Sequence, residues 1–329
     1  IGGGGGDGGG APGVPEQVSR AGVAIADASW HLGASAGQFA ETGVGIARDA
    51  GFDPYVHSVR KVGSDILGTR ITARALVVED GDGRRVGVIA NDLYLPNDFL
   101  HRRVVQLLRE HDLQVQLGTK QGPITGLSKG NLAITASHSH TSPFYSTPGV
   151  GTWIFQDVMD LRFYEYIAGQ MAQAAIDAVA GMVPARMGGI TVHSNDVQSH
   201  TYGPRVAYDG TPAGQPYDYT TQTISVVRFD DISNPGAPKP LANWLIFGVH
   251  PEWVWGEEIV NGDLTHAVMR MLDRESGAIT LWSQRETGAS GPHKDTRVHP
   301  PHARREFQES NFSGYDRAAR LLTDTLLDA

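Results

Sequence analysis

Two histidines lie one residue apart where an alternating apolar segment ends. The segment reads 131-NLAITASHSHTSPFY-145, and the histidines are His138 and His140. Residues two positions apart in an extended chain face the same side, so both imidazoles point to one place if the strand continues that far. Imidazole is a common metal ligand and exchanges protons near neutral pH. The pair therefore indicates metal or acid–base chemistry, with two hydrogen-bonded structural histidines as the alternative.

Two other apolar segments also end in a residue that binds metals. The segment 241-LANWLIFGVH-250 ends in His250, and the segment 85-RVGVIAND-92 ends in Asp92. Sites of α/β proteins form where strand ends meet loops, and imidazole and carboxylate groups are both zinc ligands. The sequence therefore predicts a ligand cluster built from three strand ends, although Asp92 would equally suit a cap on the following loop. Because the chain has no cysteine, thiolate ligands and disulfides are excluded.

The elements that must position these residues mix strands and helices without a strict repeat. The hydrophobic period, the helix caps and the turn residues predict each element. An Asp-Gly-Asp-Gly turn makes 70–80 and 85–95 a hairpin, and an Asn or Asp caps the helix from 97. The predicted strands cover 70–80, 85–95, 131–138, 185–195, 221–231, 241–250 and 278–284, and the predicted helices cover 97–113, 157–182, 264–275 and the end of the chain from 314. The Pro/Gly-rich stretches 203–218 and 233–240 are expected to be surface loops, and a Gly/Ser/Pro loop is expected after 284. This mixture predicts an α/β domain with mixed β-sheets flanked by helices.

The composition limits the classes of partner. An apolar fraction of 40% over 329 residues is enough for a substantial core. The chain has 36 acidic and 27 basic residues, a net charge of −9, and no basic block, which excludes a surface for nucleic acid. No apolar run approaches the ~20 residues needed to cross a bilayer, so peripheral contact is the expected form of membrane association.

Five blocks, in order along most of the chain, resemble the neutral ceramidase family. The segment 131–143 resembles the family's zinc-binding strand of type NVLLSGTHTHSGP, and 243–266 is similar to its NWFAVHPTSM followed by SGDNKG. The other blocks are 22-GVAIADAS-29, which resembles GVGRADITGP, the hairpin segment 67–95, and 283-SQRETGASGPH-293, which resembles SNWGDVSPN. The resemblance implies a neutral-ceramidase-like catalytic domain.

The resemblance also implies roles for the histidines. It makes His138 and His250 ligands of Zn²⁺, and it makes His140 a catalytic residue that faces the reacting carbonyl. The family completes its zinc site with a Glu and a Tyr beyond the segments matched here. A second chain or a C-terminal segment would then supply the remaining ligands, or Asp92 would, or the site would be degenerate.

The chain departs from the family pattern near the expected substrate pocket. After His250 the family's Thr-Ser-Met is replaced by Pro-Glu-Trp-Val-Trp-Gly-Glu-Glu. Trp253 and Trp255 in this stretch are predicted to line an apolar acyl pocket, with plain core packing as the alternative. Arg205 is the nearest match to the arginine that helps the family hold its substrate.

Together these features predict a zinc-dependent hydrolase that cleaves the amide bond of a ceramide-like N-acyl lipid. Zinc-activated water would attack the carbonyl and release the fatty acid. The resemblance implies a secreted protein, extracellular or in the cell envelope. Two alternatives stay open. One is a non-catalytic lipid- or glycan-binding subunit on the same fold, and the other is a zinc hydrolase of another ester or amide.

The chain is expected to have one domain behind a linker. Residues 1–14 are Gly-rich, begin at Ile1 instead of Met, and indicate a flexible segment or a trimmed start. Residues 15–329 are predicted to form the ceramidase-like N-terminal catalytic domain, incomplete at its C-terminus.

Overall fold

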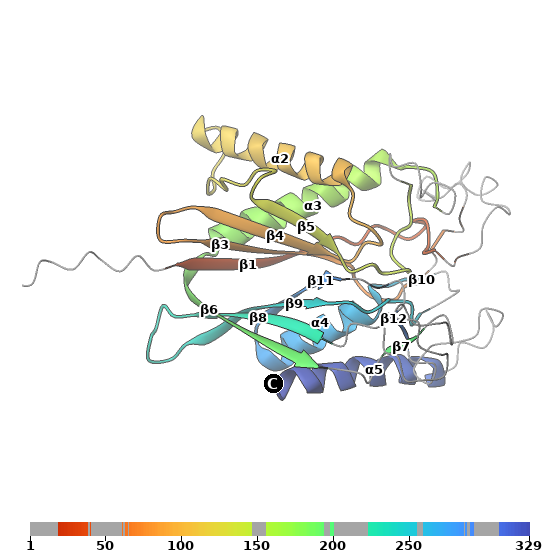
Figure 1. The fold of residues 1–329 in the computed structure, drawn as a ribbon. Coiled ribbons are helices and arrows are strands. Elements are labelled where there is room, and N and C mark those ends of the chain that lie inside the picture. The colour runs from red at the N-terminus through yellow and green to blue at the C-terminus, as the bar shows by residue number, and fades with distance from the viewer. Residues whose placement is uncertain are drawn as a thin grey trace, which may run out of the picture.

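Two layers of strands, each covered on its outer side by two helices, make up the described part of the chain (Figure 1). The computed structural model describes residues 19–38, 40, 61, 63–64, 66–146, 156–193, 198–200, 223–254, 259–285, 287, 290–292 and 309–329. The Gly-rich segment 1–14 lies outside these ranges. The expected α/β class, with a mixed sheet flanked by helices, is confirmed.

The first layer contains the predicted hairpin and the strand that leads to His138. Its strands, in spatial order, are β1 (Arg20–Asp27), β3 (Thr72–Glu79), β4 (Arg85–Asn91) and β5 (Leu132–Ala136). The β3–β4 turn is held by the Asp80 side chain, which accepts from the backbone N–H groups of Asp82 and Arg84 at 2.9 Å each. Strands β4 and β5 are parallel, so both run toward the same edge and deliver Asp92 and His138 there.

The second layer carries His250. Its strands, in spatial order, are β11 (Ile279–Gln284), β9 (Lys239–Phe247), β8 (Thr223–Asp231) and β6 (Val183–His193). Strand β6 joins the layers into one eight-stranded sheet, because its first residues pair with Arg20 and Ala21 of β1. Two short pairs stand apart, β2 (Ile66–Leu67) with β10 (Ile259–Val260) and β7 (Gln198–His200) with β12 (Ser290–Pro292).

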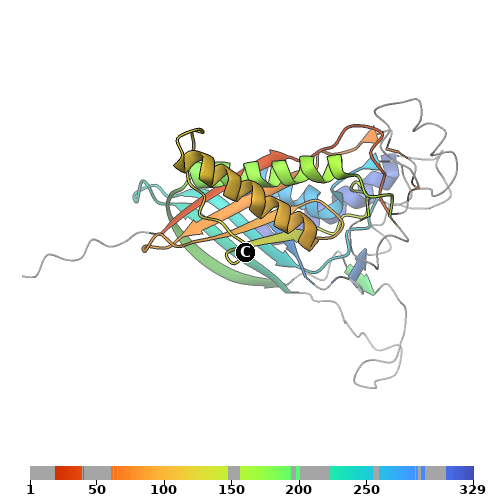
Figure 2. The same cartoon turned by 90° about the horizontal axis from the view of Figure 1, so that it is seen from above.

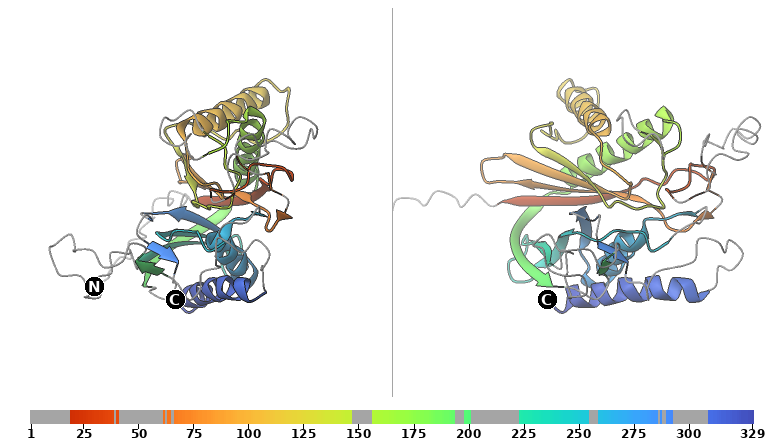
Figure 3. Two further views of the ribbon diagram at one scale, coloured as in Figure 1. Left: turned by 90° about the vertical axis from the view of Figure 1, so that its right-hand side faces the viewer. Right: turned by 45° about the vertical axis from the view of Figure 1, so that its right-hand side comes forward.

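The helices lie on the two outer faces (Figure 2 and Figure 3). Helices α2 (Asp98–Gln116) and α3 (Leu161–Ala180) cover the first layer, and α4 (Asp263–Ser276) and α5 (Glu309–Leu327) cover the second. Asn97 caps α2 by accepting from the Leu100 N–H at 2.7 Å. Asp160 caps α3 by accepting from Arg162 and Phe163, which is why that helix begins at 161 and not at the predicted 157.

Three apolar cores lie between neighbouring layers of helices and strands. Successive residues of a strand face opposite sides, and in β3 Ala75 faces α3 while Leu76 faces the second layer. The third core lies between the second layer and helices α4 and α5 and contains the fully buried Trp282.

Some predicted elements need correction. Strand β12 lies in the stretch after 284 that was expected to be a loop, and β9 begins at Lys239, inside the expected loop 233–240. The stretch 203–218 lies outside the described residues. In the part of the chain that the structure describes, no helix is long and apolar enough to cross a membrane.

Candidate metal centre

Three imidazoles from two strand-end loops form one cluster. Each of His138, His140 and His250 offers a ring nitrogen, and these atoms lie within 4.8 Å of one another. Within the described ranges they form the one group of at least three histidine or acidic side chains close enough to share an ion. The histidine cluster, as these three residues are called below, therefore joins the loop after β5 to the loop after β9.

The continuation of β4 holds His138 in place. The backbone N–H of His138 donates to the Leu93 carbonyl at 3.1 Å, and the ring Nδ1 lies 2.8 Å from the Tyr94 carbonyl. Since a carbonyl only accepts, Nδ1 carries the proton and the Nε2 lone pair is directed elsewhere. Burial lowers the pKa of His138, against the opposing effect of the Tyr94 hydrogen bond. The ring is therefore kept neutral, the form that binds metals.

His140 and His250 meet directly. Their Nε2 atoms are 2.7 Å apart, and the His140 N–H donates to the Pro251 carbonyl at 3.4 Å. His140 is buried, at 3% exposed, and its own carbonyl accepts from the Gln38 N–H at 2.7 Å. A Cβ on Gly37 would lie 2.0 Å from that carbonyl oxygen, so only glycine fits there. The three chain segments are thus packed backbone against backbone.

The histidines converge for a reason other than strand alternation. Strand β5 ends at Ala136, and His138 has a φ of 69°, in the left-handed region that non-glycine residues rarely adopt. The extended conformation therefore does not reach the pair. The turn at His138, and not a common strand face, directs its ring toward His140.

Asp92 lies outside the histidine cluster and is paired with His266. Its Oδ2 accepts from the N–H and the hydroxyl of Thr72 at 2.7 and 2.8 Å and from His266 Nδ1 at 2.8 Å. Burial alone would raise the pKa of Asp92, but His266, Arg74 and Thr72 outweigh it and lower the pKa. The structure thus uses this carboxylate to join β4, β3 and α4.

Asp263 supports the loop that carries His250. Its carboxylate accepts from the N–H groups of Trp253 and Val254 at 3.2 Å each, and from its own neighbour Leu264 at 2.6 Å. It is fully buried with a φ of 57°. Burial raises its pKa to about 7, helped by the charge of Glu252 and opposed by the three N–H donors.

The predicted substrate residues have different outcomes. Trp253 is 0% exposed and belongs to the core with α4 and α5, so it offers no surface to a ligand. The core-packing alternative therefore describes Trp253, because its loop is pulled inward by Asp263. Arg205 and Trp255 lie outside the described residues.

Sequence reasoning missed Tyr94, His266 and Asp263. Tyr94 stacks on His138, with ring centroids 4.5 Å apart and planes at 21°. Asp263 lies directly before the predicted helix from 264, and His266 follows three residues later, so extending that helix by one residue would have placed both on one face. The partners of Tyr94 and His266, which are His138 and Asp92, are distant in sequence, and this leaves no local signal for their contacts.

The residues of the histidine cluster fit a transition metal such as zinc. Zinc binds imidazole nitrogen, and the cluster offers two or three of the three protein ligands that catalytic zinc sites use. The Nδ1–H of His138 donates to a backbone carbonyl, which is the usual support for a ligating histidine. The donor set is therefore suitable for a metal ion.

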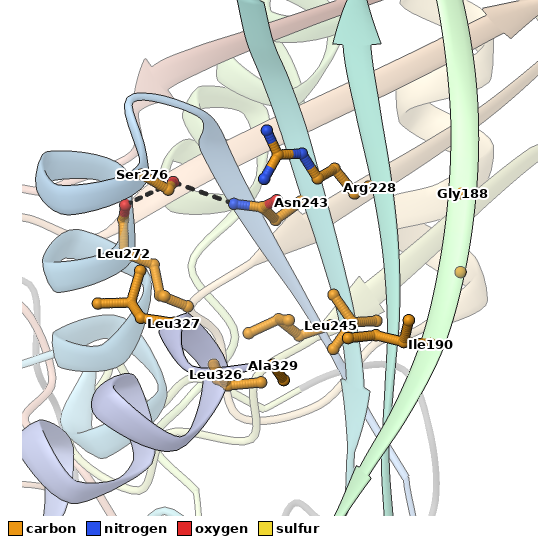
Figure 4. A pocket seen from close by; sticks show the side chains of 12 residues that line it. Gly188, Ile190, Arg228, Asn243, Leu245, Leu272, Ser276, Leu326, Leu327 and Ala329 are labelled. Carbon is orange, nitrogen blue, oxygen red and sulfur yellow. Dashed lines mark hydrogen bonds between the residues drawn. The ribbon is translucent and has the colours of Figure 1, made fainter.

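A separate cavity lies on the helix-covered side of the second layer (Figure 4). It has a volume of about 400 Å³ and lies between β6, β8 and β9 and helices α4 and α5. Asn243 donates to Ser276 at 3.2 Å at one end, Arg228 also lines the cavity, and most of the other lining residues are apolar. Among the described residues that line it there is no member of the histidine cluster, so it is not the site of the predicted chemistry.

A comparison with solved structures agrees with the resemblance seen in the sequence. No protein-family model and no curated protein matches the chain. A crystal structure of neutral ceramidase from Pseudomonas aeruginosa matches with a TM-score of 0.63 at 17% identity, covering 94% of this chain and 44% of that chain. A structure of ceramidase complexed with C2 matches with a TM-score of 0.63 at 16% identity, over 94% of this chain and 43% of the other. The chain thus spans less than half the length of these structures, and it shares their fold over nearly all of its own length.

Proposed function

We propose that the protein is a zinc-dependent hydrolase that cleaves the amide bond of a ceramide-like N-acyl lipid. The observation that carries this proposal is the histidine cluster, three imidazoles with nitrogens within 4.8 Å, at the strand ends of a fold similar to ceramidase structures. Both structures are ceramidases, and this likeness supports a ceramide-like substrate for the chain. Peripheral contact with a membrane and an extracellular or cell-envelope location are part of the same proposal.

His138 and His250 would hold the ion. His138 suits this role because its Nδ1 donates to the Tyr94 carbonyl and leaves Nε2 as the ligand atom. His250 presents Nε2 to the same place from the other layer. When bound, zinc supplies Lewis acidity that makes water nucleophilic near neutral pH and polarises a carbonyl.

His140 would act on the substrate. Its ring lies beside both other imidazoles, with centroids 4.8 Å from His138 and 4.6 Å from His250. From there it can donate a hydrogen bond to the oxygen that becomes negative as the carbonyl is attacked, a contribution of about 3–4 kcal/mol for a well-placed donor. The water oxygen bonds to the acyl carbon, the C–N bond breaks, and a proton from the water is transferred to the nitrogen of the leaving amine.

Metal content and hydrolysis test this proposal together. The purified protein is expected to hold zinc by elemental mass spectrometry and to release fatty acid from ceramide, and a chelator is expected to stop the release. His138→Ala and His250→Ala should each lose the metal and the activity. His193→Ala is the control, because His193 is exposed at the end of β6.

The outcome for His140→Ala separates two roles. If His140 acts on the substrate, the variant keeps its zinc and loses hydrolysis; if it is a third ligand, the variant loses both. Zinc without hydrolysis of any N-acyl or O-acyl substrate would refute the enzyme and favour the lipid- or glycan-binding alternative. Hydrolysis of other esters or amides, but not of ceramide, would point to a related hydrolase.

A further inference from the structure

Tyr94 lies between the histidine cluster and the core. Its ring stacks on His138 at 4.5 Å and 21°, and it meets His140 nearly at a right angle, 89°, at 4.8 Å. On another side it contacts Phe144 at 4.9 Å and 66°. Phe144 is 1% exposed, so the tyrosine ring rests on a fixed part of the core.

The same residue also supports His138 through its backbone. The Tyr94 carbonyl accepts the hydrogen bond from His138 Nδ1 at 2.8 Å, next to the Leu93 carbonyl that accepts from the His138 N–H at 3.1 Å. Ring and carbonyl of one residue therefore contact one imidazole on its face and at its nitrogen. These contacts define the plane of the ring and the position of its proton together.

His138 needs such support because of its backbone. Its φ of 69° is unfavourable for a residue with a Cβ, and such conformations persist where the surroundings hold them. No strand ladder sets the direction of its side chain, because β5 has already ended at Ala136. The stacked ring and the carbonyl of Tyr94 provide what the strand does not.

We propose that Tyr94 is a positioning residue for the metal site. Its ring, held against Phe144, fixes the planes of His138 and His140 relative to each other, and it keeps the Tyr94 carbonyl where His138 Nδ1 can donate to it. The Nε2 lone pair of His138 is then presented to the ion in one orientation. This inference rests on the metal site of the proposed function, and it adds the residue that orders that site before an ion arrives.

Three variants test the proposal. Tyr94→Phe keeps the ring and removes the hydroxyl, whereas Tyr94→Leu removes the aromatic ring. Phe99→Leu is the matched control, since Phe99 is a half-buried aromatic residue of α2 whose ring contact is with Tyr164. Each protein is titrated with Zn²⁺ and with Co²⁺, whose visible spectrum reports its coordination. The tautomer of His138 is read from long-range ¹H–¹⁵N NMR spectra of the metal-free protein.

The aromatic ring of Tyr94 is expected to affect metal binding and the His138 tautomer, and the Tyr94 hydroxyl is not. Tyr94→Leu should weaken metal affinity about 10- to 100-fold, the usual effect of losing support around a ligand, alter the Co²⁺ spectrum and give mixed His138 tautomers. Tyr94→Phe and Phe99→Leu should match the parent. If Tyr94→Leu keeps the parent's single tautomer and affinity, the proposal is refuted. A parent that binds no metal refutes the proposed function, while the tautomer comparison still decides the role of Tyr94.

Discussion

One oxygen of Asp92 receives three hydrogen bonds, from two atoms of Thr72 and from His266. Both partners of the Asp92–His266 pair are almost fully buried, with side chains 0% and 2% exposed. The other carboxylate oxygen is buried without a partner among the described residues. A buried pair of this kind is costly to disrupt, because the remaining partner cannot reach water.

Asp92→Ala is therefore expected to lower the free energy of unfolding by about 3–5 kcal/mol. Asp27→Ala, which breaks the exposed pair with Arg70, should cost less than about 1 kcal/mol. Urea unfolding in the presence of a chelator measures both, free of any effect of metal. Metal content measured on the same samples before chelation tests Asp92 as a ligand. If Asp92→Ala retains zinc, Asp92 is not a ligand of the ion.

At the scale of elements, helix α3 lies directly on strand β1. A Cβ built on Gly22 would be 1.8 Å from the Ala178 carbonyl oxygen, closer than any atom can come. Alanines on both sides allow this approach, among them Ala75 of β3 and Ala175 of α3, both 0% exposed. The small residues set the distance between the helix and the sheet.

Gly22→Ala should therefore displace α3 and destabilise the protein by about 1–3 kcal/mol or more, as overpacking does. Gly169→Ala lies within α3, where nothing is within 4 Å of the added methyl group. It is expected to stabilise the protein by up to about 1 kcal/mol, because alanine favours the helix. Thermal unfolding of the two variants decides; a Gly22→Ala variant as stable as the parent would mean that α3 can move away from β1 without cost.

The elements with local signals could be predicted from the sequence. The hairpin of β3 and β4 was expected from its Asp-Gly turn, and α2 from its cap and apolar spacing, and both are confirmed within a few residues. His138 and His250 were expected at strand ends, and the structure brings them together with His140. The hydrophobic period, the helix caps and the turn residues are local signals. The elements that they predict are present because the tertiary contacts favour the same elements.

What depends on distant contacts could not be predicted. The pairing of Asp92 with His266 joins residues 174 positions apart, and no periodicity connects them. The stacking of Tyr94 on His138 requires the left-handed turn at His138. The strand-like sequence before His138 does not predict that conformation. Trp253 is fully buried because a carboxylate from the next helix binds its loop. In each case the partner, and not the residue itself, decides the role.

At the scale of the whole molecule, the histidine cluster joins the two layers. His138 and His140 come from the first layer and His250 from the second, and Asp263 at the start of α4 holds the loop after His250. Asn261, just before α4, donates its N–H to the Thr141 carbonyl at 2.9 Å and thereby connects both loops. A change in the protonation of Asp263 therefore affects the contacts between the two layers, and with them the free energy of unfolding.

The raised pKa of Asp263 predicts a pH dependence of folding. Its folded pKa is about 7, mainly because of burial and also because of Glu252, whereas an unfolded aspartate has a pKa of about 3.9. Between these values the folded state holds a proton that the unfolded state has lost, so this group stabilises the protein at low pH and the contribution disappears as pH rises to about 7. Asp263→Asn, which tolerates the left-handed φ of 57° and cannot ionise, should remove this slope. Urea unfolding of parent and variant with a chelator, across that pH range, gives the difference; parallel pH profiles would mean that the N–H groups of Trp253, Val254 and Leu264 keep the carboxylate charged.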